Sequence, residues 1–250
     1  MKRMLLTISY DGTAYHGWQV QPNAITVQQV LQESLQKLLG QKTNATGCSR
    51  TDAGVHARQF CCHIDCADNI PEQAFLKGLN SILPDDISVV DCIEVPENFH
   101  ARYNAIGKEY IYGMYLGAKN PFLERYYLHL DKQPDIDLMN QFASTIIGTH
   151  DFAPFSSSGR TVEDTVRTVK RCSAVQDGNK IHFSITADGF LYNMVRIISG
   201  TALAVSYGQL APDCAAKIFS EGDRSLARDT LAPHGLFLNK VFYKGSETDG

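Results

Sequence analysis

The sequence has no apolar run that approaches the roughly 20 residues needed to span a bilayer as a helix. Its first residues, MKRMLLTISYDG, carry two basic side chains, but polar Thr7 and Ser9 interrupt the apolar stretch. The stretch is too short for the core of a signal peptide, and no small-residue cleavage site follows it. Because the same residues alternate in polarity and stop at Asp11 and Gly12, they predict a β-strand followed by a turn.

Several motifs that define well-known enzyme classes are also absent. The chain has no G-x-S-x-G, Walker A or G-x-G-x-x-G pattern, which argues against serine hydrolases and nucleotide-dependent enzymes. The run CCHIDC at 61–66 resembles a metal site, but on a strand Cys61 and His63 face away from Cys62. No second ligand pair stands at zinc-finger spacing, so we predict no bound metal.

Charge and cysteine content restrict the compartment and the partners. Seven cysteines are an odd number, and without a secretion signal they predict reduced thiols in the cytoplasm. The formal net charge of −4 gives no general attraction to nucleic acid, so an RNA contact needs a local basic surface. Basic side chains gather in three places, as solvated faces or as phosphate contacts: Arg50 with Arg58; His100, Arg102 and Lys108; and Arg160, Arg167, Lys170 and Arg171.

Hydrophobic periodicity predicts the secondary structure of the N-terminal part. A helix is expected after Thr26, because apolar residues recur there at helical spacing. Thr26 with Gln29 forms a capping-box pattern, and Gly40 is suited to end the helix. The further elements expected are strands at 57–66 and 86–95, with a helix at 70–83 between them.

A second round of elements begins with a strand at 107–117. It continues with a helix at 135–147, strands near 166–176 and 180–187, a helix at 191–207 and a last strand at 235–244. The two rounds resemble a duplicated split β-α-β unit, in which helices cover one face of an antiparallel sheet. We therefore predict an α+β fold from two successive rounds, at 1–105 and 106–250, with helices on one face of an antiparallel sheet.

The run GCSRTDAGVHA at 47–57 raises the main question about chemistry. An aspartate followed by Ala-Gly is common in turns, because its carboxylate can accept hydrogen bonds from nearby backbone N–H groups. Asp52 is also a candidate nucleophile or base, since an aspartate is ionised at neutral pH without assistance. Arg50 and Arg58 would then offset the cost of desolvating that anion. Local sequence alone favours the turn over the active site.

Two further residues have both a structural and a functional interpretation. Tyr110 lies with Tyr112 and Tyr115 in the strand KEYIYGMY. Such tyrosines pack in a core or, in RNA-binding proteins, form a platform on which bases stack. Arg196 lies in an otherwise apolar helix, where it either reaches the surface or pairs with a functional carboxylate.

Seven motifs follow one another along nearly the whole chain. They are YDGTAYHGWQVQP (10–22), RTDAGVHA (50–57), FHARYNAIGKEYIY (99–112), THDFAPF, TVRTV, FLYNMVRIISGT and LAPHGLFLNKVFY. In this order they resemble the bacterial tRNA pseudouridine synthase I family, also called TruA. One such motif is weak evidence, whereas seven in the same order are strong.

The resemblance implies a role for each candidate residue. Asp52 matches the catalytic aspartate of the family, Tyr110 its tyrosine beside the target base, and Arg196 its arginine paired with that aspartate. Arg50 and Arg58 match basic residues at the mouth of the site. The family fold, a largely antiparallel sheet from two ferredoxin-like halves, agrees with the predicted element order.

The resemblance also implies an activity and an assembly. Family members isomerise uridine to pseudouridine at positions 38, 39 and 40 of the tRNA anticodon stem-loop, as homodimers and without a cofactor. A non-catalytic RNA-binding or RNA-chaperone module on the same scaffold is the alternative, although binding alone needs no buried carboxylate that faces a polyanion. A carboxylate-nucleophile hydrolase is disfavoured, because no metal-binding carboxylates stand close to Asp52.

One departure from the family pattern stands directly before Arg50. Cys48 and Ser49 occupy the place where Ala-Gly is expected. A serine can replace that glycine only if its φ angle is negative. The backbone of this loop therefore decides whether the departure matters.

Overall fold

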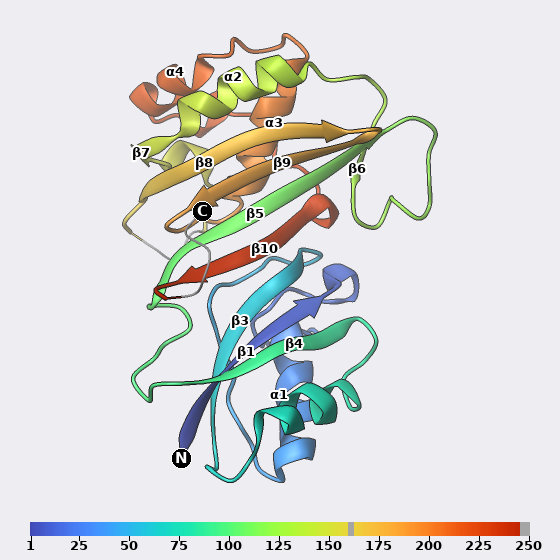
Figure 1. Cartoon of the computed structure of the whole chain (residues 1–250). Coiled ribbons are helices and arrows are strands. Elements are labelled where there is room, and N and C mark those ends of the chain that lie inside the picture. The colour runs from blue at the N-terminus through green and yellow to red at the C-terminus, as the bar shows by residue number, and fades with distance from the viewer. Residues whose placement is uncertain (160–162, 246–250) are drawn as a thin grey trace. The chain divides into compact units, whose positions relative to one another are not determined.

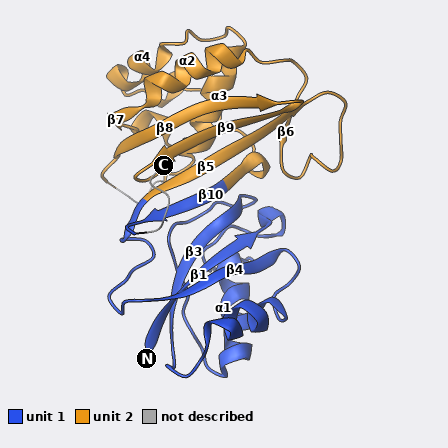
Figure 2. Cartoon of the chain, in the orientation of Figure 1, with its two compact units in different colours: residues 1–106, 238–250 blue, residues 107–237 orange. Residues whose placement is uncertain are grey.

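The computed structural model describes residues 1–159 and 163–245, so Arg160 lies outside the described residues. The chain forms two compact units (Figure 2): residues 1–106 with those from 238 onward, and residues 107–237. Helices are combined with mostly antiparallel strands, which confirms the predicted α+β class. The halves 1–105 and 106–250 describe element order along the chain and stay a prediction.

Unit 1 is built on three antiparallel strands with β1 (Lys2–Tyr10) between β3 (His56–Cys66) and β4 (Ile87–Val95). The short β2 (Thr46–Gly47) pairs with β3, and the part of β10 (Leu236–Tyr243) that belongs to unit 1 also lies beside β3. Two helical connections pack on one face of these strands (Figure 1). This order is that of a split β-α-β unit.

The first connection, α1 (Val27–Leu39), has the termini that its sequence predicts. Thr26 Oγ1 accepts the Gln29 N–H at 3.4 Å, and Gly40 ends the helix with a φ angle of 70°. The Gln29 side chain instead donates to Glu33 Oε1 at 2.9 Å, in place of the reciprocal capping-box bond. The cap therefore rests on Thr26.

The second connection is shorter than predicted. Helical residues run from 72 to 80 instead of 70 to 83, and Ala74–Leu79 is a π-helix. At its end, the Asn80 side-chain amide donates to the Val89 carbonyl, and its oxygen accepts the Val89 N–H, both at 2.8 Å. Asn80 thus joins the helix to the neighbouring β4, a long-range contact that hydrophobic periodicity does not reveal.

In unit 2 the central strands are antiparallel, and β9 (Lys180–Ala187) lies between β5 (Ala105–Leu116) and β8 (Val166–Asp177). These three strands confirm the prediction. Two short strands were not predicted: β7 (Gly148–Asp151) pairs with β8, and β6 (Leu128–Leu130) lies parallel to β5.

The helices of unit 2 are α2 (Ile136–Ile146), α3 (Met194–Ser206) and α4 (Cys214–Glu221). Figure 1 shows them together on one face of the strands, and α2 packs against both β8 and α3. Phe142 on α2, Phe183 on β9 and Ile197 on α3 are fully buried and form part of the core. The sequence predicted α2 and α3 but not α4.

Candidate active site

Asp52 lies at the first position of a tight turn between β2 and β3. The Val55 N–H donates to the Asp52 carbonyl at 3.1 Å, and Gly54 has a φ angle of +77°. A glycine with positive φ at the third position is typical of a type II turn. Thr51 and Val55 are buried, whereas Asp52 is partly exposed. The turn is therefore compatible with an active-site role, because it leaves Asp52 partly exposed between the buried residues Thr51 and Val55.

The segment 10–18 holds this turn in place. The Trp18 N–H donates to the Thr51 carbonyl at 3.1 Å, and the Gly54 N–H donates to the Tyr15 carbonyl at 3.2 Å. Gly17 allows this approach, because it has a φ angle of +82° and a Cβ there would collide with the Thr51 carbonyl oxygen. The motifs at 10–22 and 50–57 are thus joined by backbone hydrogen bonds and form one local structure.

Two buried side chains fix the ends of the same loop. The Tyr10 hydroxyl hydrogen-bonds Thr51 Oγ1 at 2.8 Å. His56 is 1% exposed, and its Nδ1 accepts the Gly12 N–H at 3.0 Å. Tyr10 and His56 are therefore positioning residues, and sequence reasoning did not single them out. Their motifs were visible, but nothing local in the sequence pairs Tyr10 with Thr51.

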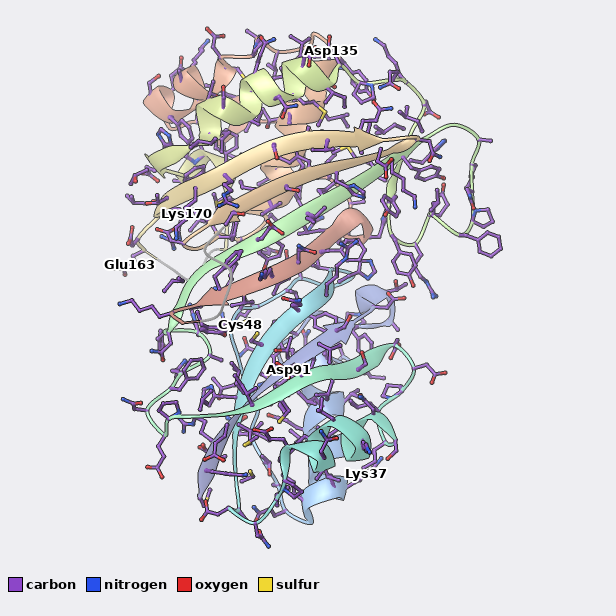
Figure 3. All side chains as sticks on the ribbon, viewed as in Figure 1. Lys37, Cys48, Asp91, Asp135, Glu163 and Lys170 are labelled. Atoms are coloured by element: carbon purple, nitrogen blue, oxygen red, sulfur yellow. The ribbon has the colours of Figure 1, made fainter. Side chains whose placement is uncertain are left out.

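The departure at Cys48 and Ser49 fits the loop without backbone strain. Cys48 is labelled in Figure 3. Its backbone N–H donates to the Cys61 carbonyl at 2.8 Å, which continues the pairing of β2 with β3. Asn193 is the one non-glycine residue with positive φ in the described part of the chain, so Ser49 has negative φ. A serine therefore adopts this conformation as readily as a glycine.

The two basic residues of the site mouth differ in their surroundings. Arg50 is exposed on the loop that carries Asp52. Arg58 is exposed on β3, where its Nη1 donates to Asn239 Oδ1 on β10 at 3.3 Å. Both side chains belong to unit 1 and face solvent, as phosphate contacts require.

Arg196 is partly buried on α3 in unit 2, where two acceptors fix its guanidinium. Its Nε donates to the Leu231 carbonyl at 2.6 Å, and its Nη1 donates to Asn193 Oδ1 at 2.7 Å. Asn193 has a φ angle of 61°, and its amide donates to Ser157 Oγ at 3.0 Å. A non-glycine residue held in the left-handed region often marks a functional site. Sequence reasoning missed Asn193, although it stands inside FLYNMVR.

Tyr110 lies in β5 of unit 2 and is 6% exposed. Its ring meets Phe190 edge to face, with centroids 5.0 Å apart. The neighbouring Tyr112 is fully buried and donates its hydroxyl to the Ala232 carbonyl at 2.7 Å. Tyr110 therefore has an aromatic packing partner of its own in unit 2.

The cysteine-rich strand does not form a metal cluster or a reactive thiol. Burial raises the pKa of Cys61 to about 11, so this thiol stays protonated at neutral pH. Within residues 1–159 and 163–245, no three His, Cys, Asp or Glu side chains are placed to share a metal ion. Over the same residues, no helix has the length and apolar character to cross a membrane.

The fold and the loop define a class of protein. Both units combine helices with antiparallel strands, and unit 1 presents one partly exposed aspartate on a turn locked between buried residues. The class is thus an α+β protein with a mostly antiparallel sheet and a partly exposed aspartate on a locked turn.

Comparison with known proteins makes the assignment specific. The family model described as tRNA pseudouridine synthase matches residues 6–104 and 142–244. The chain is 44% identical to the tRNA pseudouridine synthase A of Clostridium kluyveri and 43% identical to tRNA pseudouridine synthase A 2 of Clostridium perfringens. Each alignment covers 97% of this chain and 100% of the relative. The chain belongs to the tRNA pseudouridine synthase family, which confirms the resemblance.

A further relative shows the same level of identity, whereas a solved structure is much less similar. The tRNA pseudouridine synthase A of a Thermoanaerobacter species is 42% identical over 97% of this chain and 100% of its own length. The solved archaeal box H/ACA Nop10-Cbf5 complex matches 80% of this chain and 44% of its own, at 13% identity and a TM-score of 0.34. That overlap is too low to add to the assignment.

The family model covers all of the candidate residues except Tyr110. Asp52, Arg50, Arg58 and Arg196 fall inside the matched residues, whereas Tyr110 falls in the unmatched stretch between 104 and 142. Tyr110 is therefore supported by the motif that contains it and not by the family model.

Proposed function

We propose that this protein isomerises uridine to pseudouridine in tRNA, with Asp52 as the catalytic carboxylate. The observation that carries the proposal is full-length similarity to tRNA pseudouridine synthases, 44% over 244 residues in one case. The locked turn adds support, because it holds the carboxylate partly exposed on a loop whose ends are buried.

The reaction breaks the bond from C1′ to N1 of the uracil and forms a bond from C1′ to C5. N1 gains a proton, and the hydrogen at C5 leaves as a proton, so no electrons enter or leave. A base in a stacked stem is out of reach and has to be flipped out first, at a cost of a few kcal/mol. Asp52 then acts on C1′, on C6 of the uracil, or as a base at C2′, and these three routes have the same atom balance.

The finer assignments follow the family pattern. We place the target uridines at positions 38, 39 and 40 of the anticodon stem-loop. Tyr110 flanks the flipped uracil, Arg196 is the counter-ion of Asp52, and Arg50 and Arg58 bind the RNA backbone. The fixed Asn193 and Leu231 acceptors support the role of Arg196, because a held guanidinium is preorganised for a carboxylate.

The test of the activity is Asp52→Asn, assayed by release of tritium from C5-labelled uridine in tRNA. We expect turnover to fall by at least about a thousandfold, because the amide neither attacks carbon nor takes a proton. Binding of tRNA should be equal or tighter, since one negative charge is removed. Asp91→Asn on the exposed face of β4 is the matched control and should release tritium like the wild type.

The outcomes separate the candidate functions. Substantial tritium release by Asp52→Asn contradicts the catalytic assignment. A wild-type protein that binds tRNA but releases no tritium is the non-catalytic RNA-binding or chaperone module instead. Mapping pseudouridine in tRNA from cells with and without the protein identifies the uridines.

Assembly, compartment and cofactor requirement belong to the same proposal. We propose that the protein is cytoplasmic, because tRNA is a cytoplasmic substrate, and that it needs no cofactor, because the isomerisation has no redox step. We also propose a homodimer, which follows the family pattern. The seven cysteines are all free thiols, as expected of a reducing compartment. Sedimentation equilibrium measures the mass, and dialysis against a chelator before the tritium assay checks the independence from metal.

A further inference from the structure

A turn at 100–104 in unit 1 presents an exposed aromatic side chain that the activity above does not use. Tyr103 is 76% exposed. Its neighbours on the turn are Arg102, which is exposed, and His100, which is partly buried. We call Tyr103, His100 and Arg102 the Tyr103 platform.

The backbone of this turn is held by its own side chains. The His100 N–H donates to Asn104 Oδ1 at 2.6 Å, and the Asn104 N–H donates to the His100 carbonyl at 3.0 Å. His100 Nδ1 accepts the Arg102 N–H at 3.1 Å. The exposed ring therefore stands on a rigid turn, so little conformational entropy is lost when a partner binds.

The ring of Tyr103 also rests on a column of imidazoles that reaches the sheet. Its centroid lies 4.2 Å from that of His100, which in turn lies 4.9 Å from that of His63. His63 on β3 is 7% exposed, and its Nδ1 accepts the Ala101 N–H at 3.1 Å. An isolated exposed aromatic residue is common on protein surfaces. A ring that is held by a neighbouring imidazole and is still 76% exposed is a preorganised stacking surface.

The charges around the platform suit a polyanion. The Arg102 guanidinium carbon lies 5.9 Å from the centroid of the Tyr103 ring. The nearby carboxylate of Asp65 is neutralised by Arg3, whose Nε and Nη2 donate to it at 2.7 and 2.8 Å. Glu97 also interacts with Arg3. Arg102 itself is exposed, so it can contact a phosphate next to a stacked base.

We propose that the Tyr103 platform stacks an unpaired base of the same tRNA, with Arg102 on a neighbouring phosphate; this rests on the proposed function. The two sites are within reach of one RNA. From His56, four residues after Asp52, to His63 the strand β3 advances by roughly 23 Å at about 3.3 Å per residue. That length corresponds to about seven nucleotides of a stacked strand.

The experiment compares Tyr103→Leu with Tyr103→Phe in equilibrium binding of unmodified tRNA at fixed salt. Loss of one base stack should weaken binding by about 5- to 150-fold in Tyr103→Leu, whereas Tyr103→Phe keeps the ring and the affinity. Phe122→Leu is the control, because Phe122 is 86% exposed in unit 2. In the tritium assay, KM should rise in Tyr103→Leu while kcat stays unchanged.

A second arm identifies the base. Abasic substitutions through the anticodon loop should weaken wild-type binding at one position, and at that position Tyr103→Leu should cause no further loss. Additive effects at every position overturn the stacking proposal, as does wild-type affinity of Tyr103→Leu. A change of mass in sedimentation by Tyr103→Leu overturns it too, because the platform then contacts a second copy of the chain.

The two proposals fail in different ways. If the wild type binds tRNA without tritium release and Tyr103→Leu weakens that binding, the proposed activity is wrong and the platform stands. If the wild type releases tritium and Tyr103→Leu binds normally, the platform alone is wrong.

Discussion

Gly17 shows at the residue scale why the candidate site depends on backbone contacts as much as on side chains. Its φ angle of +82° is open to glycine at little cost, and a Cβ there would meet the Thr51 carbonyl oxygen. Gly40 has a similar φ angle of +70° but nothing within 4 Å of the same position. An alanine at Gly40 would therefore meet only backbone strain, whereas an alanine at Gly17 would meet both strain and a steric collision.

Gly17→Ala should therefore destabilise the protein more than Gly40→Ala. Both variants pay about 1–2 kcal/mol for a left-handed alanine, and Gly17→Ala adds about 1–3 kcal/mol of overpacking against the loop of Asp52. Urea unfolding measures the free energies. Equal losses in the two variants would show that the loop yields to the extra methyl group.

Sequence reasoning reached Asp52 but not the residues that hold it. The motif RTDAGVHA marks the aspartate, and the glycine of a turn is visible in it. The partners of that turn come from residues 10–18, and only the folded chain brings the two segments together. Asn193 was missed for a related reason: asparagine is enriched in the left-handed region, but most asparagines do not adopt it, so the sequence alone does not mark this one.

The start of α1 is the clearest case at the scale of elements. Thr26 is fully buried and accepts the Gln29 N–H, while the Gln29 side chain is directed to Glu33. The helix therefore depends on one half of the capping box that its sequence predicts.

Thr26→Ala should cost about 1 kcal/mol, because a partly buried N–H at the helix start loses its acceptor. Gln29→Ala removes only an exposed contact within the helix and should cost less than about 0.5 kcal/mol. Thermal unfolding of the two variants compares these effects. If Gln29→Ala lost as much stability as Thr26→Ala, the Gln29 side chain would also take part in the cap, as in a complete capping box.

Elements long enough to show a repeating apolar pattern were predicted from the sequence, whereas very short elements were not. α1 and α2 have clear apolar faces and α3 is buried on nearly every side, and all three were expected from the sequence. β2 has two residues and β6 has three, too few for alternation to be recognised, and pairing with β3 and β5 alone makes them strands. The π-helix at Ala74–Leu79 likewise has no period that distinguishes it from an α-helix in sequence.

His63 connects one buried side chain to the stability of the whole molecule. Burial, followed by the positive charges of Arg3 and His100, lowers the pKa of His63 to about 4. The unfolded chain takes up this proton near pH 6.5, whereas the folded chain takes it up only near pH 4. Stability is therefore complete above pH 6.5 and falls as the pH decreases from 6.5 to 4.

His63→Asn should flatten this pH dependence, because an asparagine oxygen can accept the Ala101 N–H without binding a proton. Between pH 6.5 and 4 the wild type should lose up to about 1.4 kcal/mol per pH unit more than the variant. Urea unfolding at several pH values measures the slopes, with the exposed His16→Asn as control. Parallel slopes for wild type and His63→Asn would assign the acid sensitivity to other groups.

The division of β10 between the units has a consequence for synthesis on the ribosome. Unit 1 contains residues 1–106 but receives the strand residues after 238 only when all of unit 2 has been translated. Until then the part of β3 that β2 does not cover lacks that neighbour, and its unpaired N–H and C=O groups form an open edge in the nascent chain. The first unit to leave the ribosome is thus the last to be completed, and its open edge can pair with other chains during that interval.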